Sequence, residues 1–121
     1  MDHTLEIDSK NQIIRITATC ELNQKIRKQI LKDIAEMLKK YGYARALIDL
    51  TGTEFDYHVP GTGAAELTAY MGTLGLPPQT KLAFTYAEAE PHRKHYQQVC
   101  QREGYNVLYF KSVNEALGWL K

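Results

Sequence analysis

The chain lacks the features that mark a disulfide framework, a zinc ribbon or a membrane protein. Only two of its 121 residues are cysteines, Cys20 and Cys100, and they form no CxxC pair. The sequence therefore predicts two reduced thiols. No apolar run approaches the ~20 residues that cross a bilayer, and residues 1–4 lack the basic segment of a signal peptide. We expect a cytoplasmic protein with no membrane span.

The chain also has little net charge and none of the common catalytic motifs. Its 15 basic and 14 acidic residues give a net charge of +1, so nothing indicates nucleic acid as a partner. There is no GxSxG elbow, P-loop, GxGxxG or HExxH. His92 and His95 share a helix face, but no third ligand completes a zinc site. The sequence predicts no metal and no cofactor.

What is present is an alternation of strands and helices, within one domain over residues 1–121. Residues 5–7 and 12–19 alternate apolar and polar side chains around a polar turn, which predicts an antiparallel hairpin. Asn23 is placed to cap a helix that ends at Tyr41 before Gly42. Residues 44–50 form a continuous apolar run, typical of a central strand covered on both faces.

The second half continues the alternation. Residues 64–74 predict a helix, residues 81–86 a strand, and residues 91–103 a helix with Cys100 packed on its apolar face. A strand at residues 107–110 precedes a last helix capped by Ser112. The order β-β-α-β-α-β-α-β-α predicts an α/β fold, a mostly parallel mixed sheet of about five strands with helices packed on it.

Three stretches resemble the single-domain STAS-like proteins of the SpoIIAA-like type. They are Ala46-Leu47-Ile48-Asp49-Leu50-Thr51-Gly52, Lys81-Leu82-Ala83-Phe84, and Val107-Leu108-Tyr109-Phe110 with Glu115-Ala116-Leu117-Gly118-Trp119-Leu120. The likeness covers most of the chain through core residues, which argue for fold more than for activity. It implies a non-enzymatic regulatory or binding module.

The resemblance also marks a phosphorylation position. The family's Asp-Ser-Ser-Gly segment, whose second serine is phosphorylated in true antagonists, is here Pro60-Gly61-Thr62-Gly63. Thr62 occupies the place of the modified serine, whereas Pro60 and Gly61 replace the acid and the first serine. The intact motif is therefore missing, which argues against anti-sigma antagonist activity. A hydroxyl at this position is also explained as a simple helix N-cap, because threonine is a favoured capping residue with no further role.

Ligands of open parallel sheets bind outside the carboxyl ends of the strands. Two connections leave such ends, and their residues are our candidates for contact with a ligand or partner: Thr51, Phe55, Asp56, Tyr57, His58, Thr62, Tyr86 and His92. The segment from Thr51 to Gly61 is long against the usual median of about four to six residues. Polar side chains on loops are also common without any function.

Two functions stay open on the sequence alone. The first is a module that docks a protein partner or a small, lipophilic ligand at the surface of residues 51–63. The second is a small enzyme that uses His58 or His92 with a neighbouring carboxylate. A homodimer is possible with either function.

The first helix carries a stripe of basic side chains near Arg27: Lys25, Lys28, Lys32 and Lys39. This stripe is either a solvated face or a docking surface for an acidic partner.

Overall fold

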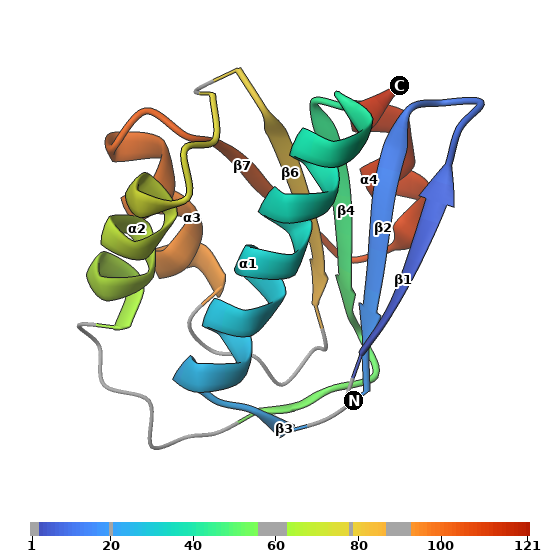
Figure 1. Cartoon of the computed structure of the whole chain (residues 1–121). Coiled ribbons are helices and arrows are strands. Elements are labelled where there is room, and N and C mark those ends of the chain that lie inside the picture. The colour runs from blue at the N-terminus through green and yellow to red at the C-terminus, as the bar shows by residue number, and fades with distance from the viewer. Residues whose placement is uncertain (1–2, 20, 56–62, 78, 87–92) are drawn as a thin grey trace.

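The computed structural model of the chain describes residues 3–19, 21–55, 63–77, 79–86 and 93–121. Figure 1 shows their arrangement. The elements are, in order, β1 (His3–Asp8), β2 (Ile13–Ala18), β3 (Glu21–Leu22), α1 (Gln24–Tyr41), β4 (Arg45–Leu50), β5 (Glu54–Phe55), α2 (Gly63–Thr73), β6 (Lys81–Tyr86), α3 (Arg93–Arg102), β7 (Asn106–Phe110) and α4 (Val113–Leu120). The predicted order is confirmed, and the two-residue strands β3 and β5 are additions to it.

The main sheet has five strands in the order β1-β2-β4-β6-β7. β1 and β2 form the predicted antiparallel hairpin, whereas β2, β4, β6 and β7 run parallel to one another. The predicted mostly parallel mixed sheet is therefore confirmed. The carboxyl ends of the four parallel strands meet at one edge, where Leu50 lies opposite Tyr86. The small parallel pair β3–β5 lies at the same end of the molecule (Figure 1).

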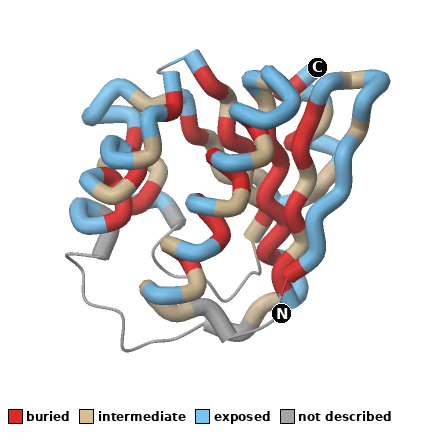
Figure 2. Tube along the Cα trace, viewed as in Figure 1, coloured by how far each residue is buried: buried red, intermediate tan, exposed pale blue. Residues whose placement is uncertain are grey.

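Helices cover the sheet on both faces. Ile48 and Leu50 of β4 belong to the core cluster that packs against α1, α2 and α3, whereas Leu47 belongs to a second cluster with Ala116 and Leu120 of α4. This division follows from the strand period of two, which sends neighbouring side chains to opposite faces. Figure 2 shows the buried residues gathered along the central strands and the inner sides of the helices.

The first helix begins and ends where its sequence predicts. The Asn23 side chain accepts a hydrogen bond from the Ile26 N–H, and Gly42 ends the helix in the left-handed conformation, with φ 69°. One side chain differs from expectation. Arg27, predicted near the basic surface, is buried.

Gly42 offers a test of this helix end. A Cβ at Gly42 would touch nothing within 4 Å, so Gly42→Ala should destabilise the fold by about 1–2 kcal/mol through backbone strain alone. Gly118, inside α4, also has open space around its missing Cβ but no positive φ. Gly118→Ala should therefore stabilise by about 0.5–1 kcal/mol. Urea unfolding of both variants measures these two changes in stability, which should have opposite signs. Equal changes would contradict the role of Gly42 as the left-handed C-cap of α1.

Candidate functional site

The carboxyl edge of the sheet is organised by Asp49, a buried acid near the end of β4. Its Oδ1 accepts hydrogen bonds from the Thr51 hydroxyl at 2.6 Å, the Thr51 N–H at 3.1 Å and the Thr85 hydroxyl at 2.8 Å. Its Oδ2 lies 3.8 Å from Nη2 of Arg15 on β2. One carboxylate thus joins three neighbouring strands and fixes the turn that leaves β4.

The surroundings of Asp49 keep it ionised. Burial by itself would raise the pKa of this carboxyl, but the hydrogen bonds from Thr51 and Thr85, together with the charge of Arg15, hold the pKa below its ordinary value of 3.8. A general base needs a pKa nearer to neutrality and a free lone pair directed at its substrate. Asp49 is therefore a positioning residue for the edge.

Two of the sequence-predicted site residues lie together at this edge. Thr51 is exposed and follows Leu50, which pairs directly with Tyr86 at the end of β6. The half-buried Tyr86 ring lies 6.4 Å from the ring of Tyr109 on β7. The backbone of Phe55 pairs with Leu22 in the small sheet. The other candidates, Asp56, Tyr57, His58, Thr62 and His92, lie outside the described residues.

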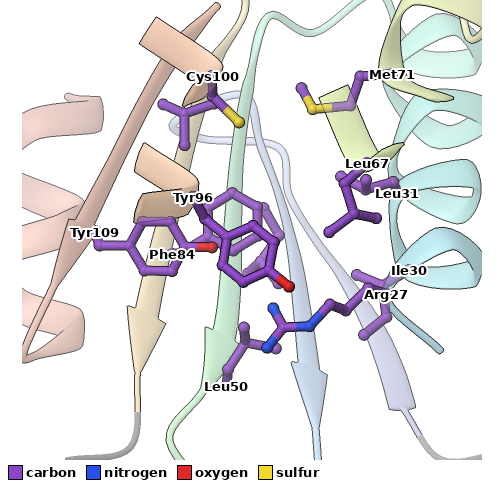
Figure 3. A pocket seen from close by; sticks show the side chains of 12 residues that line it. Arg27, Ile30, Leu31, Leu50, Leu67, Met71, Phe84, Tyr96, Cys100 and Tyr109 are labelled. Carbon is purple, nitrogen blue, oxygen red and sulfur yellow. The ribbon is translucent and has the colours of Figure 1, made fainter. Parts of the chain in front are cut away.

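Above the sheet, beside this edge, α1, α2 and α3 enclose a mainly apolar cavity of about 30 Å³. Figure 3 shows its lining: Arg27, Ile30, Leu31, Ile48, Leu50, Leu67, Met71, Phe84, Tyr96, Cys100, Val107 and Tyr109. The Arg27 guanidinium lies 4.7 Å from the centre of the Tyr96 ring, a cation–π contact. A cavity of this volume holds about one water molecule, so the space is far too small for a lipid.

Cys100 contributes to the wall of the cavity, as its predicted position on the apolar face of its helix requires. The side chain is buried, and burial raises the pKa of its thiol despite a hydrogen bond with Thr68. A thiol with a raised pKa is a poor nucleophile at neutral pH. The packing role predicted for Cys100 is confirmed.

Two lysines of the basic stripe on α1 hold α2 in place. Lys28 Nζ donates to the Glu66 carboxylate, and Lys39 Nζ donates to the Leu74 carbonyl just beyond the end of α2. The stripe is therefore only partly available to an acidic partner. Lys25 and Lys32 are exposed and keep that surface basic.

Asp49, Thr85 and Arg15 were absent from the sequence candidates. One signal pointed to Asp49, since it is the one charged residue among the apolar residues 46–50. Its partner Thr85 is 36 positions away in the chain and becomes a neighbour only through the parallel register of β4 and β6. Among the described residues, no group of three or more His, Cys, Asp or Glu side chains could hold a metal ion.

Comparisons with known proteins bear on the fold. No family model matches the chain, and no curated protein matches its sequence. A solved structure, the anti-sigma factor antagonist SpoIIAA in its unphosphorylated form, matches with a TM-score of 0.53, over 98% of this chain and 95% of that one. The fold is SpoIIAA-like. With 12% sequence identity, the match confirms the predicted architecture and leaves activity to be argued from the site.

Proposed function

We propose that the chain is a non-enzymatic regulatory module that docks a protein partner at the carboxyl edge of its sheet. The docking region, called here the edge surface, comprises Thr51, Gly52, Tyr86 and the exposed start of α2 at Ala65 and Glu66. The observation that carries the proposal is the Asp49 network. It fixes the turn at Thr51 to two neighbouring strands, and a fixed surface loses little entropy when a partner binds.

The structure favours a protein partner over a small lipophilic ligand. The cavity beside the edge holds about one water molecule, whereas ligand pockets usually measure about 300–1,000 Å³. The similar solved protein SpoIIAA is itself named an anti-sigma factor antagonist, a name that refers to a protein target. That similarity supports a regulatory role here without identifying the partner.

Several expectations from the sequence remain predictions. The enzyme alternative rests on His58 and His92, and the phosphorylation position is Thr62; all three lie outside the described residues. Mass spectrometry of Thr62 in protein isolated from its own cells would decide whether it is modified. No helix in the described part of the chain is long and apolar enough to cross a membrane, and a cytoplasmic location is still a prediction.

A matched pair of arginine substitutions tests the edge surface. A Cβ at Gly52 would meet Thr19 and Ala18 at 3.5 and 3.6 Å, ordinary contact distances, so Gly52→Arg adds a large charged group at the edge while leaving the fold intact. Gln79→Arg adds the same group in the exposed turn two residues before β6, at the opposite end of the strands. In affinity capture from native cells, a partner held by wild type should be lost with Gly52→Arg and kept with Gln79→Arg.

Melting temperatures of the two variants provide the folding control. Capture that survives Gly52→Arg, or that is lost equally with Gln79→Arg, would contradict docking at the edge surface. If the wild-type protein captures no specific partner from an extract of its native cells, that result would count against the regulatory function itself.

A further inference from the structure

β1 is an edge strand whose outer side and both faces are largely open. It is the first strand in the sheet order, and among the described strands it pairs only with β2. His3 is buried against α1, where its Nε2 lies 2.6 Å from Asp33 Oδ2, but the next four residues, 4–7, are all exposed. Figure 2 shows the strand exposed along most of its length. An edge of this kind offers unpaired backbone N–H and C=O groups to another strand.

Two of the three exposed large apolar side chains in the described part of the chain lie on β1. They are Leu5 and Ile7, exposed by 37% and 41%. Leu5 and Ile7 lie opposite Ile16 and Ile14 of β2, so they point toward the face that α1 covers.

We propose that a second copy of this chain covers the outer side of β1. The two β1 strands would pair antiparallel around a two-fold axis at Leu5. The pairing would join two five-stranded sheets into one continuous sheet. It uses the outer side of β1, whereas the proposed function uses the carboxyl ends of β4 and β6, and so it does not depend on the proposed function. A two-fold interface requires a patch that complements itself, and the residue pattern of β1 meets that condition.

The self-complementarity follows from the register. An axis perpendicular to the sheet keeps each face on its own side, so odd residues must oppose odd residues. With the axis at Leu5, Leu5 faces Leu5, Ile7 faces His3, and Glu6 faces Thr4 of the other copy. An axis at Glu6 would place two carboxylates directly opposite each other, which is destabilising. An axis at Thr4 would pair only residues 3–5 of the strand, and an axis at Ile7 only residues 6–8. Within His3–Asp8, the axis at Leu5 is therefore favoured.

Charge substitutions at adjacent positions separate this pairing from a general effect on β1. Leu5→Lys places two ammonium groups opposite each other at the axis and also removes the apolar contact between the two leucines, so it should weaken dimerisation at least about tenfold. Thr4→Lys places each ammonium group opposite Glu6 of the other copy and should keep the dimer. Light scattering across a concentration series should give twice the chain mass of 13.8 kDa for wild type and Thr4→Lys, and monomer for Leu5→Lys.

A cysteine pair tests the axis itself. Directly opposed residues have Cβ atoms about 4.5–5.5 Å apart, so Leu5→Cys should form a disulfide between copies on mild oxidation, identified by peptide mass spectrometry. Ile7→Cys should not, because the two cysteines would lie four residues apart along the strands, about 13 Å. Wild type that stays monomeric at every concentration, a dimer unaffected by Leu5→Lys, or cross-linking through position 7 alone would overturn the proposal.

Discussion

A chain that ends at Lys111, and so lacks α4, should lose most of its stability. α4 supplies the cover for Ile13, Leu47 and Ala83 on one face of the sheet, and its own Ala116 and Leu120 have 0% exposure. Each large apolar side chain that returns to water costs about 1.5–3 kcal/mol, so the loss should be at least about 4 kcal/mol. That is comparable to the typical whole stability of about 5–15 kcal/mol. Urea unfolding followed by circular dichroism measures it.

A single substitution gives the same test without shortening the chain. Leu120→Ala should destabilise by about 2–5 kcal/mol, because the leucine is fully buried. Asn114→Ala, on the exposed side of the same helix, should change stability by less than about 0.5 kcal/mol. An unfolding midpoint unchanged by either the truncation or Leu120→Ala would show that α4 does not support the sheet.

The second large effect is expected at Asp49. Asp49→Ala removes the acceptor for Thr51 and Thr85 and the negative charge beside Arg15. Hydrogen bonds to a charged group are worth about 1.5–3 kcal/mol each, and the buried Thr85 hydroxyl would be left without its acceptor. We therefore expect a loss of about 2–4 kcal/mol, measured by urea unfolding. Thr73→Ala is a matched control, since its hydroxyl bonds only locally to the Tyr70 carbonyl on the surface.

The same carboxylate predicts a dependence on pH. The folded-state pKa of Asp49 lies below the ordinary 3.8, so the ionised form stabilises the fold above that pH, and the contribution disappears as pH falls through the lowered value. The stability gap between wild type and Asp49→Asn should be largest above about pH 5 and should shrink below pH 3.8. A gap that stays constant on acidification would contradict an ionised, hydrogen-bonded Asp49.

Much of the fold could be predicted because local signals and packing agree. The apolar stripe of α1 with its Asn23 and Gly42 caps, and the apolar run of β4, each specify one kind of element. β3 and β5 could not be predicted, since two residues carry no periodicity and these strands exist only through their pairing. Arg27 was misjudged from its charge. Its spacing of three, four and seven residues before Ile30, Leu31 and Ile34 places it on the apolar face of α1, and there its guanidinium lies over the Tyr96 ring of α3.

The neighbourhood of two candidate residues could be predicted from the sequence, but the interactions that organise the candidate site could not. Ligands of parallel sheets bind outside the carboxyl ends of the strands, and this rule selected Thr51 and Tyr86 as neighbouring candidates. The pairing of β4 with β6 confirms that the two residues are neighbours. The residue that organises the edge, Asp49, was missed because its partners are set by the sheet register. The sequence of α1 did not reveal that Lys28 and Lys39 have partners. Those partners, Glu66 on α2 and Leu74 just after it, are far away in the chain.

Hydrogen–deuterium exchange of the protein, with and without its captured partner, tests docking at the edge surface most directly. Binding there should slow exchange in peptides covering residues 50–55 and 63–67. Peptides covering residues 74–81, at the opposite edge, should exchange as before, and any protection of residues 3–8 should be present without the partner. Protection of residues 74–81 with none at 50–55 would contradict the proposed function.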